Sequence, residues 1–207
     1  MTVALATQMF AGIGSALALI VPVDFSSVTN TTDITLPNSL AFNGISFTFD
    51  NGGVNPDPTF GNPNTAFIDT NGITGNAYGT LIFNFSQMAF KLNVDYALLN
   101  GTPLPLPVTD GLTVLFSSGG NIVDNLTIPA SFYNGNGDAA GQLVYSAAPS
   151  VYFDQAQLIF SADAPYFNVS AVSAEIVPEP SSYALAIVGI GVIACGRFVR
   201  RRLPSSK

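Results

Sequence analysis

Alternation of apolar and polar residues constrains the fold of this chain more than any other feature. In the stretch "FNGISFTFD" it places Ile45, Phe47 and Phe49 on one side and small or polar residues on the other. The same period of two recurs in "TLIFNFS", "FKLNVDYALL", "GLTVLF", "QLIFSA" and "YFNVSAVSAEIV". Successive side chains of a strand point to opposite faces, so this pattern predicts strands that are buried on one face.

Turn signals separate these segments. Asn-Gly pairs begin at positions 43, 51, 71, 100, 134 and 136, and a Gly-Gly pair begins at position 119. Asn and Gly accept the positive φ angles that tight hairpin turns require. Short strands, frequent turns and the lack of an amphipathic helical pattern predict an all-β fold. We expect an antiparallel β-sandwich, jelly-roll-like, over residues 24–176.

The charges and the absent residue types limit the chemistry of this body. Before Arg197 the chain has thirteen acidic residues and one base, Lys91, a net charge of −12, whereas residues 197–207 carry +5. Phosphate groups would be repelled by such a surface, which excludes nucleic acid as a partner. The chain has no histidine, so histidine-based catalytic triads and zinc sites are excluded. Its single cysteine, Cys195, excludes an intramolecular disulfide.

The first 23 residues form an apolar leader, "MTVALATQMFAGIGSALALIVPV". No charge occurs from Val3 to Val23, and residues 16–18 read Ala-Leu-Ala, which resembles a signal-peptidase site. We expect a secretory signal peptide, although no Lys or Arg follows Met1. The alternative is an apolar first strand of the body.

The C-terminal stretch combines an apolar run with a basic end. Residues 183–196 carry no charge, and as a helix these 14 residues would span about 21 Å of a hydrocarbon core of about 30 Å. We expect a single, marginal C-terminal transmembrane helix. The positive-inside bias places the basic cluster behind it in the cytoplasm. This cluster consists of Arg197, Arg200, Arg201 and Arg202.

Two prolines that flank a glutamate precede this run, in the order Val177, Pro178, Glu179, Pro180. A Pro-Glu-Pro motif, a short apolar helix, an arginine cluster and the chain end resemble the PEP-CTERM sorting signal of bacterial exported proteins. The resemblance covers residues 177–207. It implies export, transient anchoring in the inner membrane, cleavage near residues 178–180 by an exosortase, and delivery to the cell surface or extracellular matrix. It also implies a producing bacterium that makes exopolysaccharide.

Candidate ligands for a metal lie in two loops. Asp50, Asn55 and Asp57, and separately Asp138 in "NGNGD", could supply oxygen ligands to Ca²⁺. Their spacing does not match the calcium-loop pattern D-x-[DN]-x-[DN]-G. The alternative is tight turns in which Asx side chains bond their own backbone. No other cofactor is expected.

The sequence therefore favours a non-catalytic surface or extracellular-matrix protein whose body associates with exopolysaccharide or biofilm. A Ca²⁺-assisted carbohydrate-binding module is the alternative, for which exposed tyrosines would stack on sugar rings. The candidate tyrosines are Tyr133, Tyr145, Tyr152 and Tyr166. A glycoside hydrolase is a remote alternative, because no local motif marks a catalytic acid among the aspartates.

Overall fold

The computed structural model describes residues 18–28, 32–52, 67–69 and 72–177. These residues form thirteen strands and one short 3-10 helix, η1 (Phe25–Ser27). The strands are β1 (Leu19–Val23), β2 (Thr32–Asp33), β3 (Leu40–Phe42), β4 (Ile45–Asp50), β5 (Phe67–Asp69), β6 (Gly72–Asn76), β7 (Thr80–Leu99), β8 (Val108–Ser118), β9 (Asn121–Ala130), β10 (Phe132–Tyr133), β11 (Ala139–Ser146), β12 (Phe153–Phe160) and β13 (Tyr166–Ile176). The prediction of an all-β body is confirmed. No helix among these residues is long and apolar enough to span a membrane, and the expected span over residues 183–196 lies outside them.

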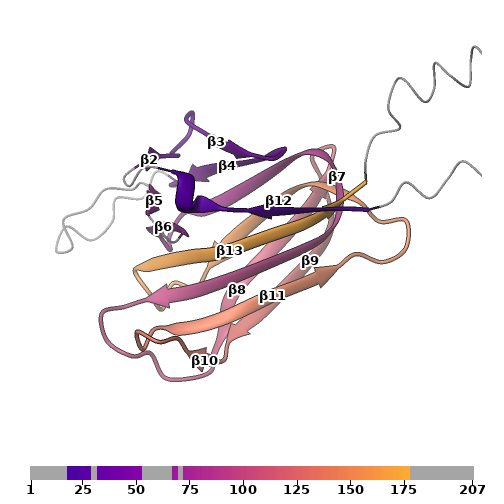
Figure 1. Cartoon of the computed structure of the whole chain (residues 1–207). Helices are drawn as coiled ribbons and strands as arrows, with labels where there is room; N and C mark the ends of the chain where they lie inside the picture. The colour runs from indigo at the N-terminus through magenta and orange to yellow at the C-terminus, as the bar shows by residue number, and fades with distance from the viewer. Residues whose placement is uncertain (1–17, 29–31, 53–66, 70–71, 178–207) are drawn as a thin grey trace, which may run out of the picture. The chain divides into compact units, whose positions relative to one another are not determined.

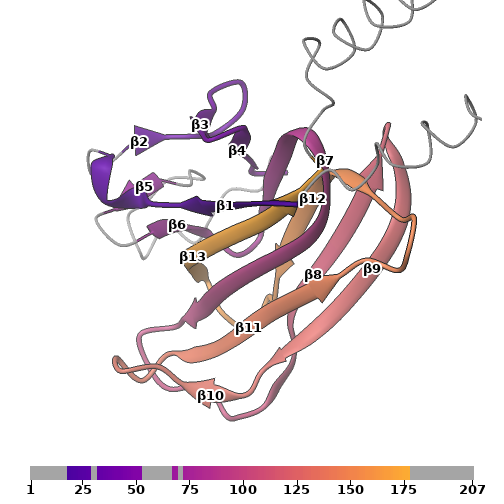
Figure 2. The ribbon, with the colours of Figure 1, turned by 45° about the vertical axis from the view of Figure 1, so that its right-hand side comes forward.

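Two layers of antiparallel strands share the long strand β7 (Figures 1 and 2). Layer A contains β3, β4, the first half of β7, β12, β8 and β9, in that order. Layer B contains β10, β11, the second half of β7 and β13, and the far edge of β13 pairs with both β6 and β1. In Figure 2, β13, β7 and β11 run in front of β12, β8 and β9. The expected sandwich is present, and the jelly-roll-like connectivity stays a prediction.

Strand β7 joins two segments that the sequence pattern predicts as separate strands. Its buried positions are odd-numbered at first, as at Leu81 and Phe83, and even-numbered later, as at Leu92 and Val94. The change of phase coincides with a register shift, in which Glu175 pairs with Lys91 but Ile176 pairs with Ala89. Such an irregularity bends a strand and re-aims its side chains. It lets one strand face the same core first from layer A and then from layer B.

Aromatic side chains fill the space between the layers. The rings of Phe116 in β8 and Tyr145 in β11 stack at 3.8 Å, and those of Phe160 in β12 and Phe167 in β13 stack at 3.9 Å. Neither pair lies on paired strands, so both contacts cross from one layer to the other. Aromatic pairs of this kind contribute about 0.5–1.5 kcal/mol each beyond the area that they bury. Phenylalanines are accordingly the largest of the fully buried side chains.

The hairpin turns also follow the sequence signals. Asn43 and Gly44 connect β3 to β4 with φ angles of 47° and 87°, and Gly119 and Gly120 connect β8 to β9 with φ angles of 55° and 80°. Residues other than Asn and Gly rarely accept two successive positive φ angles. These pairs therefore fix where the chain reverses and which side chains face the core.

The sheet begins at Leu19, five residues before the expected start of the body. Strand β1 pairs with β13 from Leu19 opposite Ile176 to Val23 opposite Val172. Strand β6 pairs with β13 only from Tyr166 to Val169, and β1 pairs with the remainder of the same edge. Residues 19–23 therefore form the apolar strand that the sequence left as an alternative, and the described sheet extends past the predicted domain boundary at residue 24. Residues 1–17 lie outside the described part, where a signal peptide stays a prediction.

Candidate functional site

A groove of about 840 Å³ lies on the outer face of layer B. Asp95 and Ala97 line it from β7, at positions that alternate with the core residues Leu92 and Val94. Further lining residues come from β6, β10, β11 and β13, and from the β10–β11 loop. We call this depression the layer B groove.

One row of cross-strand neighbours forms the length of the groove. Thr74 lies opposite Asn168, Asn168 opposite Ala97, Ala97 opposite Ala140, and Ala140 opposite Phe132. Adjacent strands are about 4.8 Å apart, so this five-strand row is about 19 Å long. The short side chains of the two alanines leave the middle of the row open to a ligand. Polar side chains stand at one end, and Phe132, which is 52% exposed, stands at the other.

Hydrogen bonds hold the polar side chains of the groove in place. The Gln142 Nε2 donates to Asp95 Oδ1 at 2.6 Å, and the Asn168 Nδ2 donates to Thr74 Oγ1 at 2.9 Å. An amide has two N–H donors and a carbonyl acceptor, and a carboxylate has two acceptor oxygens. Each of these bonds therefore orients a side chain while it leaves further donors and acceptors on Asp95, Gln142 and Asn168 for a ligand.

The β10–β11 loop forms a rigid rim beside Phe132. The Asn134 Oδ1 accepts hydrogen bonds from the backbone N–H groups of Asn136 and Asp138, each at 2.9 Å. The Asn134 Nδ2 donates to Asp138 Oδ2 at 3.2 Å. Gly137 supplies the positive φ angle, 83°, that the tight turn needs. Asn136 is left exposed on the rim, where the groove is lined by its side chain.

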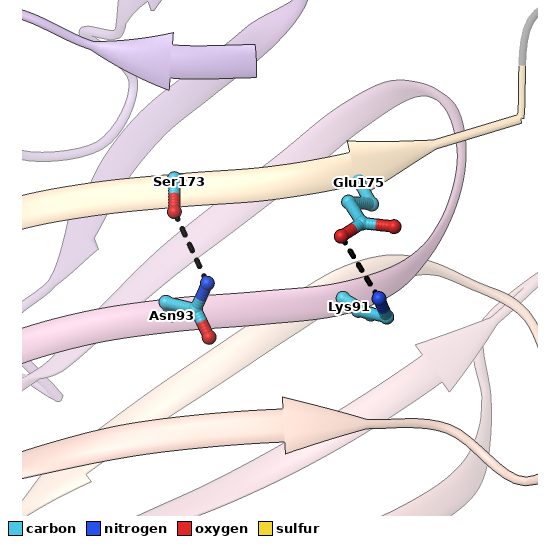
Figure 3. A network of polar contacts seen from close by, with 4 residues as sticks. All are labelled: Lys91, Asn93, Ser173 and Glu175. Carbon is cyan, nitrogen blue, oxygen red and sulfur yellow. Dashed lines mark hydrogen bonds and ion pairs between the residues drawn. The ribbon is translucent and has the colours of Figure 1, made fainter. Parts of the chain in front are cut away.

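The same outer face continues as a polar ladder toward the far end of the sheet (Figure 3). The Lys91 Nζ contacts Glu175 Oε1 at 2.9 Å, and the Asn93 Nδ2 donates to Ser173 Oγ at 3.2 Å. Both contacts join β7 to β13. Lys91 is the only basic residue before Arg197, so the ion pair neutralises the one positive charge of the body.

The candidate calcium ligands that the structure describes form hydrogen bonds within tight turns. The Asp50 Oδ1 accepts a hydrogen bond from the Gly52 N–H at 2.9 Å, and Asp138 is bonded by Asn134 as described above. Asn55 and Asp57 lie outside the described residues. Within the described residues no three His, Cys, Asp or Glu side chains gather closely enough to hold a metal. Calcium binding stays a prediction.

The tyrosines expected to be exposed have different environments. Tyr145 is buried, so that expectation was wrong for this residue, and its hydroxyl donates to Asp124 Oδ2 at 2.8 Å. Burial raises the pKa of the Tyr145 phenol, and the hydrogen bond and charge of Asp124 raise it further. Tyr133 and Tyr152 are exposed and Tyr166 is half-buried. None of the four is among the residues described as lining the groove.

Phe132 is the aromatic residue that the sequence reasoning missed. It stands beside Tyr133 in "SFYNGNGD", directly before two Asn-Gly pairs. Neighbouring strand residues point to opposite faces. Tyr133 accordingly turns away and donates a hydrogen bond to the Leu104 carbonyl at 2.6 Å, while Phe132 faces the groove. An aromatic pair before a glycine turn was the only local signal.

The described body ends where the sorting motif begins. The Val177 N–H donates to the Met88 carbonyl at 2.8 Å, immediately after β13. Pro178, Glu179, Pro180 and the arginine cluster lie outside the described residues. A family model described as "PEP-CTERM protein-sorting motif" matches residues 177–202. The chain carries a PEP-CTERM sorting motif. The match includes both the Pro-Glu-Pro junction and the arginine cluster, and it indicates an exported protein that is sorted by an exosortase.

Solved structures of sugar-binding and adhesin domains show a distant likeness. A mutant family 29 carbohydrate-binding module complexed with mannohexaose is 9% identical, with a TM-score of 0.42, and the match covers 77% of this chain and 92% of that one. A family 29 module from Piromyces equi is 11% identical over 72% and 92% of the chains, with a TM-score of 0.38. A cleaved adhesin domain of Lys-gingipain is 13% identical over 75% and 99%, with a TM-score of 0.42. No curated protein matches the chain in sequence.

Proposed function

We propose that this protein is an exosortase-sorted component of the bacterial surface or extracellular matrix. Its non-catalytic β-sandwich would associate with extracellular polysaccharide through the layer B groove. The sorting motif at residues 177–202 supports export and transient anchoring in the inner membrane. The groove is the single observation that carries the binding role.

The side chains of the groove suit a sugar polymer. Sugar rings present hydroxyl groups at their edges and C–H groups on their faces, so a binding surface needs both hydrogen-bonding groups and an apolar plate. Asp95, Gln142 and Asn168 supply the former, and the exposed ring of Phe132 supplies the latter. Ala97 and Ala140 allow a broad ligand to approach the sheet between them.

The arrangement of the acidic groups supports binding without catalysis. Asp95 and Asp138 line the groove, and each accepts a hydrogen bond from a neighbouring amide, of Gln142 and Asn134 respectively. Glycoside hydrolysis requires a pair of carboxyl groups with separate acid and nucleophile or base roles. Two carboxylates held alike by amides are suited to accepting hydrogen bonds from sugar hydroxyls, which is the role proposed for them here.

Binding to the exopolysaccharide of the producing organism tests this proposal. The full chain in detergent micelles would be run through gels that contain the purified polymer, with Ca²⁺ and with chelator. We expect the polymer to retard the wild type and to bind Phe132→Ala at least about tenfold more weakly. An aromatic side chain that becomes buried in the centre of an interface contributes about 2 kcal/mol or more to binding. Tyr152→Ala removes a similarly exposed aromatic ring outside the groove, 43% exposed against 52% for Phe132, and should bind like the wild type.

Two outcomes would overturn the proposal. The first is a wild-type chain that the polymer does not retard in either buffer. The second is an equal loss of binding in Phe132→Ala and Tyr152→Ala, since exposed aromatic residues in general, and no particular groove, would then cause the retardation.

A further inference from the structure

We infer that the layer B groove selects an uncharged polysaccharide and discriminates against acidic ones. This inference rests on the proposed function and names the chemical class of its ligand. Three features of the groove carry it: the sign of its charge, the balance of its hydrogen-bonding groups, and its length.

The described lining of the groove offers no positive charge to an acidic polymer. Among the residues that the structure describes, this lining contains two carboxylates, Asp95 and Asp138, and no basic residue. The only base of the body, Lys91, contacts Glu175 at 2.9 Å and is therefore neutralised. Carboxylate, sulfate and phosphate groups are usually held by Arg or Lys, above all where they are bound specifically. A uronate, sulfate or phosphate on the polymer would instead meet like charges within one Debye length, about 10 Å at 0.1 M salt.

The hydrogen-bonding groups of the groove are complementary to hydroxyls. A hydroxyl group both donates and accepts, so it can bond a carboxylate and an amide at the same time. Asp95 and Gln142 present such a mixed pair, and their own 2.6 Å bond holds the pair in one geometry. Asn168, fixed by its 2.9 Å bond to Thr74, presents a second amide on the other side of Ala97. An ionised acidic group on the polymer could only accept hydrogen bonds. The carboxylate oxygens of the groove, which also only accept, would then find no donor on it.

The length of the row favours a polymer over a single sugar. The neighbours from Thr74 to Phe132 cross five strands over about 19 Å. Phe132 at one end and Asn168 near the other would contact different rings of one chain. A single ring could meet only one of these groups, so the site fits a chain of several sugars that lies across the strands.

An amine-bearing polysaccharide is the competing class, because two carboxylates would attract it. Both carboxylates are already bonded by amides, and both are only half-buried, so solvent still reaches them. Exposed ion pairs contribute little and are screened by salt. The aromatic ring and the amides, by contrast, act in the same way at any salt concentration. Because the ring and the amides contribute more to binding than the screened carboxylates, the groove favours an uncharged ligand over an amine-bearing one.

The test uses the full chain in detergent micelles and three probes from the native exopolysaccharide. Ion exchange separates that material into uncharged, acidic and amine-bearing fractions, and binding of each is measured at low and at high salt. We expect the uncharged fraction to bind at least about tenfold more tightly than the acidic one at low salt, with little dependence on salt. Phe132→Ala should lose this binding, and Tyr152→Ala should retain it.

A charge variant gives a second readout. Asp95→Asn keeps the shape of the side chain and removes one negative charge, so the ratio of uncharged to acidic binding should fall at least about threefold at low salt. Tighter binding of the acidic or amine-bearing fraction by the wild type would overturn the inference and leave the proposed function standing. Binding of none of the fractions would overturn both.

Discussion

Replacement of Gly141 by alanine tests the packing of Tyr96, a buried side chain that connects layer B to layer A. The Tyr96 side chain, 3% exposed, passes beside two strand glycines and donates from its hydroxyl to the Ile128 carbonyl at 3.2 Å. A Cβ atom at Gly141 would lie 2.5 Å from the Tyr96 Oη and 2.6 Å from its Cζ, and one at Gly111 would also lie 2.5 Å from the Oη. Gly141→Ala must therefore displace a buried ring.

The expected cost follows from three contributions. Overpacking of a well-filled core costs about 1–3 kcal/mol. Loss or distortion of the Tyr96 hydrogen bond adds about 1 kcal/mol. The reduced entropy of the unfolded chain offsets about 0.4–1 kcal/mol of this. The net loss in the free energy of unfolding should be about 1–3 kcal/mol.

Gly135→Ala is the matched control, because a Cβ atom there would meet nothing within 4 Å. It should leave the free energy of unfolding unchanged or raise it by up to about 1 kcal/mol. Urea unfolding of a chain spanning residues 19–177, followed by circular dichroism, measures both changes. With a slope of about 2 kcal/mol per molar urea, Gly141→Ala should lower the midpoint by about 0.5–1.5 M. Equal midpoints for the two variants would refute the placement of Tyr96 against Gly141.

Three further outcomes follow from the structure. The raised pKa of Tyr145 means that the folded state favours the neutral phenol, so its contribution to stability is complete below the ordinary tyrosine pKa of about 10 and is lost as the pH rises above it. In alkaline titrations Tyr145→Phe should therefore unfold with a shallower pH dependence than the wild type, and an unchanged slope would contradict this. A chain that starts at residue 24 lacks β1 and leaves part of the edge of β13 unpaired, so it should melt at a lower temperature than a chain that starts at residue 19. Equal melting temperatures would show that β1 adds nothing to the stability of the fold. Ca²⁺ should not raise the melting temperature of the full chain, because the described candidate carboxylates already hold turns; a rise that Asp57→Asn abolishes would restore the calcium site predicted from the sequence.

The core strands could be predicted because their signal is local. The alternation of Ile45, Phe47 and Phe49 reports burial of one face whatever the partner strands are, and the structure buries all three. The single strand β7 could not be predicted. Its change of phase between Phe85 and Leu92 looks like a break in the sequence, whereas in three dimensions it marks the passage from one layer to the other.

The groove could not be predicted for a different reason. Thr74, Asn168, Ala97 and Ala140 are neighbours only because of the order in which β6, β13, β7 and β11 pair. Each residue in its own segment is an ordinary outward position of a strand. Strand order depends on many long-range contacts at once, and alternation gives no information about it. The sorting motif shows the opposite case, because all its elements are contiguous at residues 177–202 and it was recognised from the sequence.

An NMR titration of the body, residues 19–177, with oligosaccharides released from the native exopolysaccharide tests the central claim most directly. The account predicts saturable shifts of the side-chain amides of Gln142 and Asn168 and of the backbone amides in residues 134–141. The amides of Ile122 and Val123, exposed on β9 in the other layer, should not move. Shifts centred on β9, or none at saturating oligosaccharide, would contradict the assignment of the layer B groove as the sugar-binding site.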